Sequence, residues 1–526
     1  MKTRKYEIMK TLKYENAGLV KPLAVCMSLF ACSAFAEIRM GTPFSDGAVL
    51  QRGMAVPVWG TVAPATGEVT VEFAGQVKSA VVDAATGRWQ VELAPMQASK
   101  AGRTMTVSTS SEKLEIGDML VGEVWFASGQ SNMECPIWGR NTRYRDMKSG
   151  FMADMTRLPF VRYIKSPKKW SVEPIAAIDT KWHKFDPEGL KITYYRDGGL
   201  SAVAFYYARE LYLALDIPIG IVDVSWGGTN IDAWTPRSGY NGCDERLKFV
   251  ADYPVKSAWK AETDKLGAIR DARQQPTVIW NGMVAAYAPM AMRGFIWYQG
   301  CNNAGHGEDD LYSVRLHALY EGWRREFSNP ELRHYLVQLA PHRDNWLGIC
   351  MAQNRYVAEE KNAAIAVTAD VGNFRDIHPN DKEIVAKRLV LHALKRDYGF
   401  DIPEDDSPVC RSAEFADGKA TLHFDHVKSW YVYAPDRSRN PAFELAGEDG
   451  EWQPAKVANY RQQKGNDGKE YDTDYIDGAD IVLQSEKVAN PVKVRYMGRS
   501  RTSGTMYNEA SLPLGPFEFP HGSPAQ

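Results

Sequence analysis

The 526-residue sequence contains few cysteines and lacks several familiar functional motifs. Its seven cysteines are scattered, which excludes a small disulfide-stabilised scaffold. No glycine-rich phosphate loop and no dinucleotide fingerprint occurs, so nothing points to a nucleotide-dependent enzyme. The G-x-S-x-G motif is also missing, which leaves the α/β-hydrolase nucleophile elbow without support. No metal-ligand spacing is found, and we expect neither a metal nor a cofactor.

The sequence also lacks a large excess of positive or negative charge. The chain has 63 basic and 65 acidic side chains, and 44% of its residues are hydrophobic. This balance is typical of a globular protein and gives no electrostatic footprint for nucleic acid. The length predicts two to four domains, and the sequence does not set an oligomeric state.

The N-terminus differs from the rest of the chain. Residues 1–36 begin with basic side chains, continue with the short apolar run LAVCMSLFACSAFA and end in an A-x-A pattern. This predicts a signal peptide and an exported protein, periplasmic or secreted. The alternative is a lipoprotein signal with an anchor at Cys32. No later run is apolar enough to span a membrane.

Removal of this segment would take away six basic and two acidic side chains and change the net charge from −2 to −6. The remaining protein would have no bulk attraction for an anionic substrate. Such a substrate would need an arginine or lysine placed locally in the site.

Hydrophobic periodicity divides the remaining chain into three predicted domains. Residues 37–118 and 401–526 show short alternating runs, which favour N- and C-terminal β-sandwich-like domains. Residues 119–400 alternate five apolar runs with amphipathic patterns at 201–215, 311–327 and 381–399. The apolar runs are VGEVWFA (121–127), GIVDVSW (220–226), GFIWYQ (294–299), HYLVQLA (334–340) and AAIAVTADV (363–371). This predicts an α/β domain with a mainly parallel sheet covered on both faces. Residues 141–191 have no clear period and are expected to form loops near the site.

Four polar segments directly follow predicted strands or precede a predicted helix of this middle domain. They are GQSNM (129–133), WGGTN (226–230), QGCNN (299–303) and GNFRDIHPND (372–381). Because the carboxyl ends of parallel strands gather at one edge of a sheet, we expect these loops to converge.

Together the loops supply the parts of an acyl-transfer site. Ser131 offers a hydroxyl, which needs a base before it can attack an ester. His378 is the candidate base, and Asp376 is placed to orient the imidazole. His378 also lies just before a helix start, with Asn380 as a candidate N-cap, so a purely structural histidine is the alternative.

Oxyanion stabilisation is expected from two of the other loops. Gly227 and Gly228 can present backbone N–H groups, and Asn303 can present its amide. Gly227 and Gly228 can also form a simple tight turn, and Asn303 can serve as a loop-capping amide. The prediction therefore depends on the convergence of the loops and not on one residue.

The blocks GEVWFASGQSNM, SWGGTNIDAWTP, GFIWYQGCNNAG and DIHPNDKEIVAKRL together resemble the sialate O-acetylesterase family of SGNH-type hydrolases. Segments near both ends of the chain also look like this family. The resemblance implies a three-layer α/β/α catalytic domain with flanking β-domains. It also implies removal of O-acetyl groups from sialic acids without a metal. Ser131 matches the nucleophile, His378 the base, and Gly227, Gly228 and Asn303 the oxyanion contributors.

Two positions depart from the family pattern. Cys301 replaces the glutamate of the usual WYQGE-x-N block. The acid and base follow D-x-H spacing instead of D-x-x-H, so Ser131 and His378 can alternatively act as a dyad, with a backbone carbonyl orienting the imidazole. Further candidates for substrate contact are Gln130, Gln299 and Arg375, although sequence position alone favours an ordinary surface arginine at residue 375.

The sequence therefore predicts a serine esterase that releases acetate from O-acetylated sialic acids through an acyl-enzyme. Two alternatives remain open at this stage. One is an esterase for acetylated xylan or another polysaccharide. The other is a carbohydrate-binding protein without catalysis, which two β-domains and 15 tryptophans would also suit.

Overall fold

The computed structural model describes residues 37–137, 151–189, 199–259, 270–344, 346–372, 374–433, 442–464, 470–499 and 506–520. The fold is mixed α/β, as predicted. The predicted signal peptide, including Cys32, lies outside the described residues. Within the described ranges, no helix combines the length and apolar character that crossing a bilayer requires.

The central sheet has the strand order β10-β9-β11-β8-β12-β13-β14. Its strands are β8 (Lys113–Gly129), β9 (Val161–Lys165), β10 (His183–Lys184), β11 (Ile219–Ser225), β12 (Gly294–Tyr298), β13 (Arg333–Val337) and β14 (Ala363–Ala366). Neighbours along this path are parallel except β10 and β9. Five strands lie where the apolar runs predicted them, although β14 ends at Ala366 and the predicted run extended to residue 371.

β9 is a correction, because it lies within the stretch that the sequence assigned to loops. All five of its residues are buried, including Arg162 and Lys165. The Lys165 Nζ donates to Asp223 Oδ2 at 2.9 Å, and neither side chain is exposed. A buried charge is tolerated only when it is paired and hydrogen-bonded. These charged residues break the apolar pattern by which a core strand is recognised.

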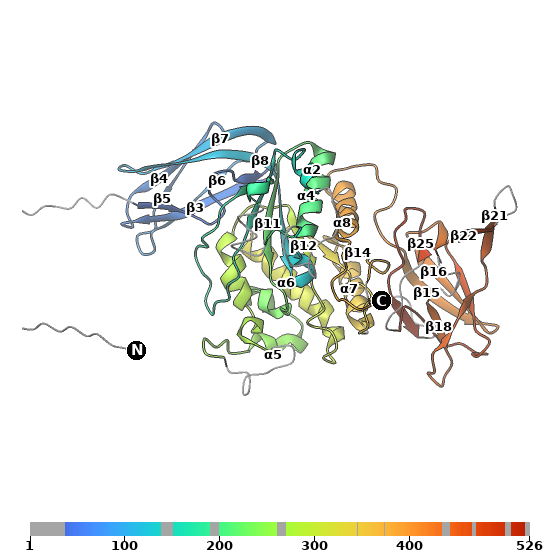
Figure 1. Ribbon diagram of the computed structural model, residues 1–526. Coiled ribbons are helices and arrows are strands. Elements are labelled where there is room, and N and C mark those ends of the chain that lie inside the picture. Colours follow the sequence, from blue (N-terminus) through green and yellow to red (C-terminus); the bar gives the residue numbers. More distant parts are fainter. Residues whose placement is uncertain are drawn as a thin grey trace, which may run out of the picture. The chain divides into compact units, whose positions relative to one another are not determined.

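Four long helices accompany the sheet: α4 (Ala202–Leu215), α6 (Tyr312–Glu326), α7 (Leu347–Glu359) and α8 (Lys382–Arg396). α4 and α8 pack against each other, and α8 also contacts β13 and β14 (Figure 1). The sequence predicted α4, α6 and α8 but missed α7. The buried side of α7 includes Gln353 and the small Ala352, so its apolar periodicity is weak.

Short helical segments make up the loops of this region. They are α1 (Ser131–Glu134), α2 (Phe151–Met155), α5 (Lys248–Ala251), the 3₁₀ turns η1 (Asp232–Trp234), η2 (Arg237–Tyr240), η3 (Glu245–Leu247), η4 (Ala272–Gln274), η6 (Ala285–Tyr287) and η7 (Asp309–Leu311), and the π-helical turn η5 (Trp280–Val284).

The N-terminal strands are β1 (Glu37–Met40), β2 (Val49–Gln51), β3 (Val56–Ala63), β4 (Glu68–Phe73), β5 (Gln76–Val81), β6 (Arg88–Leu93) and β7 (Ser99–Ser108). β1, β3 and β6 form a three-stranded sheet of their own, whereas β2, β4, β5 and β7 join the central sheet through the long strand β8. β2 and β7 pair with the first part of β8, and β11 and β12 pair with its last part. The predicted boundary between residues 118 and 119 therefore falls inside a continuous 17-residue strand.

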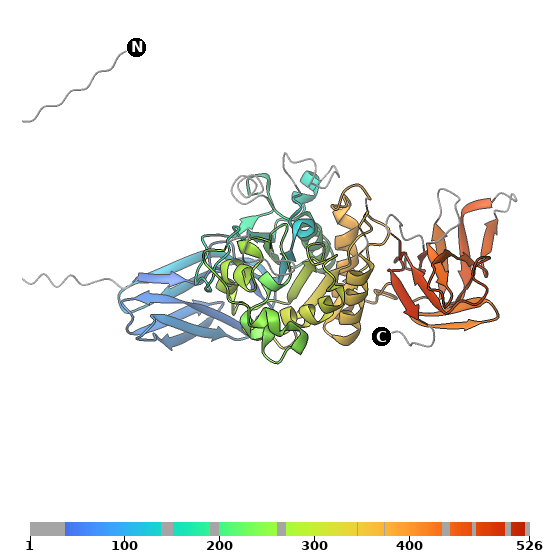
Figure 2. The same ribbon diagram turned by 90° about the horizontal axis from the view of Figure 1, so that it is seen from below.

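The C-terminal region, orange to red in Figure 2, consists of strands, with no helix among its described residues. Three four-stranded sheets have the orders β15-β16-β23-β20, β21-β22-β17-β25 and β19-β18-β24-β26. Their strands are β15 (Val409–Ala416), β16 (Lys419–Asp425), β17 (Ser429–Tyr433), β18 (Phe443–Ala446), β19 (Gln453–Pro454), β20 (Lys456–Val457), β21 (Arg461–Lys464), β22 (Glu470–Asp477), β23 (Ile481–Gln484), β24 (Lys493–Tyr496), β25 (Met506–Tyr507) and β26 (Phe517–Pro520). They share an apolar core that includes Leu422, Trp430 and Leu483.

Candidate active site

Ser131 is the first residue of α1, directly after β8 delivers the chain to the carboxyl end of the sheet. Gly129 has φ +140°, and a Cβ at this position would lie 2.3 Å from the carbonyl oxygen of Tyr298. Only glycine permits this close approach to β12. The turn leaves the Ser131 side chain partly exposed, whereas Asn132 and Met133 are buried beneath it.

The structure brings Ser131, His378 and Asp376 together. The Nε2 atom of His378 lies 2.8 Å from the Ser131 Oγ, and its Nδ1 atom lies 3.0 Å from Asp376 Oδ1. The same carboxylate oxygen accepts the backbone N–H of His378 at 3.0 Å. With the proton on Nδ1 held by the carboxylate, Nε2 is the acceptor for the serine hydroxyl. The D-x-H spacing thus allows the carboxylate to reach the imidazole.

Asn132 and Lys382 connect the nucleophile turn to the histidine loop, and sequence reasoning missed both. The Asn132 Nδ2 donates to the Ile377 carbonyl at 3.0 Å, and the Lys382 Nζ donates to Asn132 Oδ1 at 2.6 Å. Lys382 is fully buried at the start of α8. The N-cap of α8 is Asp381, whose side chain accepts from Ile384 N at 3.1 Å, and not Asn380 as the helix-start pattern predicted.

The two glycines of WGGTN have different roles in the structure. The Gly227 N–H donates to the Glu134 carboxylate, so it is already engaged and not available to an oxyanion as predicted. A Cβ on Gly227 would lie 3.1 Å from Ser131 Cβ, which shows how closely this loop packs on the nucleophile. Gly228 has φ +71°, and its own N–H has no hydrogen-bond partner among the described residues.

Glu134 is a further residue that the sequence did not single out. Besides Gly227 it accepts a hydrogen bond from the Lys168 Nζ. Burial would raise the pKa of its carboxyl, but the charges of Lys168 and the buried Lys165 outweigh this and hold the pKa below its usual value. The side chain is therefore a carboxylate at neutral pH, tying the glycine loop to α1.

Asn303 is oriented by neighbours that occupy its carbonyl oxygen. Its Oδ1 accepts from Gln299 Nε2 at 2.8 Å and from Ile231 N at 3.1 Å. Those bonds leave the Nδ2 amide with no partner in the described part of the chain. An amide fixed through its oxygen presents its N–H groups in a defined direction, as an oxyanion donor requires.

The predicted substrate contacts Gln130 and Gln299 are corrected by their burial and bonding. Gln299 is fully buried, donates to Thr229 O and Asn303, and accepts from the Tyr312 hydroxyl at 2.5 Å. The Gln130 Oε1 accepts the backbone N–H groups of Gly300 and Asn302. Both side chains hold the loops from beneath. Arg375, the third candidate, is exposed in the histidine loop.

Three donors thus remain for an oxyanion near Ser131: its own N–H, the Gly228 N–H and the Asn303 Nδ2. None of the three has a hydrogen-bond partner in the described ranges. They come from the ends of three neighbouring strands, β8, β11 and β12. The predicted loops therefore converge: the His378 and Gly227 loops meet Ser131, and Gln130 accepts from the loop that carries Asn303.

Cys301 takes the place of the family glutamate beside this site. Burial raises the pKa of its thiol well above the ordinary value, so the side chain is neutral at physiological pH. Cys301, Cys243, Cys350 and Cys410 are free thiols. A neutral thiol is a weak nucleophile, so Cys301 is not a rival of the Ser131 hydroxyl at physiological pH.

Groups of carboxylates and histidines that could hold a metal occur in another part of the chain. They are His392, Asp405 and Asp406, and Glu404, Asp406 and His426. Arg396 and Lys395 pair with Asp405 in the first group. None of these residues belongs to the Ser131 site.

The amino-acid sequence matches the family model of carbohydrate esterases described as sialic acid-specific acetylesterase over residues 121–386. It is 29% identical to the sialate O-acetylesterase of Homo sapiens over 460 residues, which cover 82% of this chain and 84% of the human protein. Identity to the sialate O-acetylesterase of Pongo abelii is 28%, with coverage of 85% and 88%.

Comparison with a solved structure also finds a carbohydrate esterase. A carbohydrate acetylesterase from Xanthomonas citri superposes with a TM-score of 0.75 at 29% identity, covering 92% of this chain and 99% of that one. The family match takes in half of the chain and includes Ser131, Gly228, Asn303, Asp376 and His378. The chain therefore belongs to the carbohydrate esterase family of sialic acid-specific acetylesterases.

Proposed function

We propose that this protein is a sialate O-acetylesterase, a carboxylic ester hydrolase that removes acetyl groups from O-acetylated sialic acids. One observation carries the proposal: the Ser131 hydroxyl lies 2.8 Å from His378 Nε2, on an imidazole whose Nδ1 meets the Asp376 carboxylate. The family match and the names of its relatives supply the substrate class.

In the first half of the reaction, His378 takes the proton of Ser131 as the oxygen attacks the acetyl carbonyl. The Asp376 carboxylate holds the imidazole in the required tautomer and stabilises its protonated form. The negative oxygen of the tetrahedral intermediate accepts from Ser131 N, Gly228 N and Asn303 Nδ2. His378 then returns the proton to the sugar oxygen, which leaves as an alcohol and produces acetyl-Ser131.

Water completes the cycle by the same route. His378 removes a proton from a water molecule that attacks the acetyl-enzyme, and the same donors stabilise the second tetrahedral intermediate. Collapse releases acetate and returns the proton to Ser131. No step needs a group other than the residues already described.

The same proposal covers the architecture. An SGNH-type three-layer domain at residues 119–400, with β-sandwich-like domains at 37–118 and 401–526, fits the parallel central sheet and the purely β flanking regions. Cleavage of residues 1–36 and export of the mature protein also belong to it.

Substitution of Ser131 by alanine tests the reaction. We expect acetate release from O-acetylated sialic acid to fall by roughly four orders of magnitude or more, with the fold retained. A serine-directed organophosphate should label the wild-type protein at Ser131 and leave Ser131→Ala unlabelled. Acetate release by the folded variant near the wild-type rate would refute the mechanism.

The preferred substrate is tested separately, with acetylated xylan as the competitor. Faster acetate release from xylan than from sialic acid would assign the same site to plant polysaccharides. Sugar binding without acetate release or labelling would instead favour the carbohydrate-binding alternative.

A further inference from the structure

A cationic side chain that sequence reasoning overlooked lies beside the oxyanion loop. Arg273 is in η4, and a Cβ placed on Gly228 would lie 3.3 Å from its Nη2 atom. Its guanidinium lies over the Trp226 ring, 5.5 Å from the ring centroid. Arg273 therefore borders Gly228, one of the proposed oxyanion donors, and its side chain is about one-third exposed.

The segment that carries Arg273 is fastened to the glycine loop. The Gln274 Nε2 donates to the Gly228 carbonyl at 2.7 Å, and Asn230 Nδ2 donates to the Gln274 carbonyl at 2.9 Å. Asp271 caps the turn by accepting Arg273 N at 3.0 Å. These bonds hold the backbone of Arg273 in place relative to the Gly228 loop.

Only part of the guanidinium is used by the protein. The Arg273 Nε donates to Asp271 Oδ2 at 3.0 Å, whereas Nη1 and Nη2 have no hydrogen-bond partner among the described residues. The cation–π contact with the Trp226 ring further restricts the position of the guanidinium. A guanidinium held at one edge and open at the other is suited to a two-pronged hydrogen bond with a carboxylate.

We propose that Arg273 binds the carboxylate of the sialic acid substrate and thereby sets the preference of the site for acidic over neutral O-acetylated sugars. The inference rests on the proposed function. It gives the mildly acidic protein the local cation that an anionic substrate requires. Arg375 is the rival position, since it is exposed on the histidine loop.

Arg246 provides a matched control within the same chain. It also follows an aspartate by two positions in a 3₁₀ turn, and Asp244 accepts its backbone N–H at 2.9 Å. In this turn, however, both Nε and Nη2 donate to Asp244, and the pair is on the surface. Arg246 thus shares the local structure of Arg273 but borders no residue of the site.

The experiment compares kcat/KM for O-acetylated N-acetylneuraminic acid with that for its carboxyl methyl ester, with acetate release as the readout. Wild type and Arg246→Gln should prefer the free acid. Arg273→Gln should reduce the acid-to-ester ratio roughly 10- to 100-fold, mainly through KM for the acid. Arg273→Lys should have a ratio between those of the wild type and Arg273→Gln, because lysine keeps the positive charge but lacks the paired N–H donors of the guanidinium.

An unchanged ratio in Arg273→Gln overturns the inference, as does an equal loss on both substrates, which indicates a structural role. A drop in Arg375→Gln but not in Arg273→Gln also overturns it. A different result would refute the proposed function itself: the wild type would hydrolyse a neutral acetylated sugar but neither sialic acid derivative. This outcome is distinguishable from failure of the Arg273 inference, in which the wild type still hydrolyses the sialic acid derivatives.

Discussion

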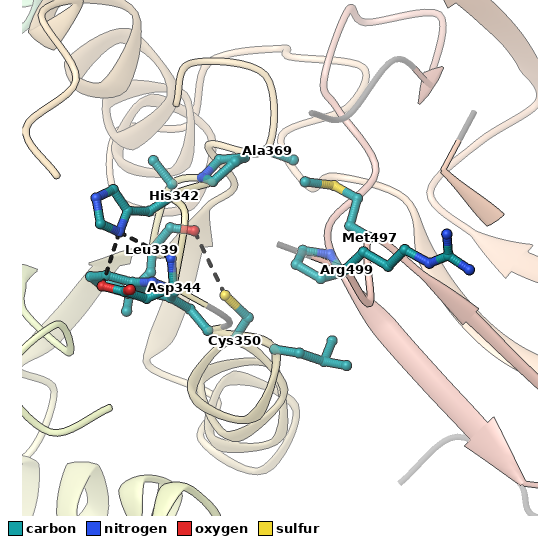
Figure 3. Close-up of a pocket in the computed structure, with 12 residues that line it drawn as sticks. Leu339, His342, Asp344, Cys350, Ala369, Met497 and Arg499 are labelled. Atoms are coloured by element: carbon teal, nitrogen blue, oxygen red, sulfur yellow. Dashed lines mark hydrogen bonds and ion pairs between the residues drawn. The ribbon is translucent and has the colours of Figure 1, made fainter. Parts of the chain in front are cut away.

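Two histidine–aspartate pairs lie between a strand of the central sheet and the helix that follows it. His378 and Asp376 lie between β14 and α8, and His342 and Asp344 between β13 and α7. Each pair is separated by two positions, each imidazole is buried, and each Nδ1 meets the carboxylate, at 3.0 Å and 3.2 Å respectively. Figure 3 shows the second pair beside Leu339 and Cys350.

The pairs differ in what the other imidazole nitrogen meets. The Nε2 of His378 faces the Ser131 hydroxyl, whereas the His342 ring packs edge-on against Trp346 and lines a cavity of about 30 Å³. Such a cavity holds about one water molecule and no sugar. A histidine–carboxylate pair is therefore not a catalytic site by itself. The hydroxyl and the oxyanion donors opposite it make the difference.

Substitution of Asp376 by asparagine breaks the catalytic pair and has the largest expected effect in this comparison. An asparagine amide can donate to Nδ1, which would place the proton on Nε2 and remove its ability to accept from Ser131. We expect kcat to fall roughly 1,000-fold. The measurement is acetate release at saturating substrate, with Asp344→Asn as the matched control, expected within about two-fold of wild type.

A loss of less than about ten-fold in Asp376→Asn would show that another group orients His378. The dyad with a backbone carbonyl would then be the better description.

Removal of the Asn303 amide tests the second difference between the pairs. Loss of one oxyanion donor typically reduces kcat by two to three orders of magnitude, so we expect roughly a 100-fold loss in Asn303→Ala. KM should change little, because the donor acts on the charge formed in the transition state. Asn303→Asp should be no better, since a carboxylate cannot donate. Retained activity in Asn303→Asp would contradict the oxyanion role.

Glu134 tests how strongly the glycine loop depends on its anchor. Gly227 N and Lys168 donate to different oxygens of Glu134, and in Glu134→Gln one of these becomes an NH₂ group that cannot accept. We therefore expect the loop to shift and kcat to fall roughly ten-fold. Glu321→Gln is the control, because it removes a comparable ion pair, with Arg324, from the surface of α6. Equal kcat values in the two variants would mean that the Glu134 carboxylate has no catalytic consequence.

A third pair, His392 with Asp405, is expected to affect stability and not activity. Burial opposes ionisation of Asp405, but His392, Lys395 and Arg396 lower its pKa well below the usual range. A lowered folded-state pKa stabilises the fold above the unfolded value of about 4, and this contribution is lost as pH falls further. Asp405→Asn should cost about 2 kcal/mol in urea unfolding at pH 7.

The same measurement below pH 4 should show a smaller difference between Asp405→Asn and wild type, while kcat at pH 7 stays within about two-fold. A difference that grows with acidity would contradict the assignment of the stabilising charge to Asp405.

The sequence predicted the strands that reach the site because their residues are apolar and continuous. It also predicted Ser131, His378, Asp376 and Asn303 as neighbours, since loops at the carboxyl ends of parallel strands must meet. β9 could not be found in this way, because the charge of its buried Lys165 is compensated by Asp223, 58 positions away. Pairing across such a distance leaves no local periodicity.

The supporting residues escaped prediction for a related reason. Glu134, Lys382 and Arg273 are ordinary charged residues in sequence, and each acquires its role from a partner on another loop. Gln130 and Gln299 show the reverse error. Their place in the motifs suggested substrate contact, but both side chains are buried and hydrogen-bond to neighbouring loops. The exposure of a side chain and its hydrogen-bond partners depend on the fold, and the spacing of residues in a sequence motif does not reveal them.

The strand β8 has a consequence for how the chain can be divided. Its first residues pair with β7 of the N-terminal region, and its last residue lies two positions before Ser131. Removal of the N-terminal region would therefore leave the first part of β8 without its partners β2 and β7. Truncation at residue 118, or exchange of this region for another, would divide the continuous strand β8, whose C-terminal end positions Ser131.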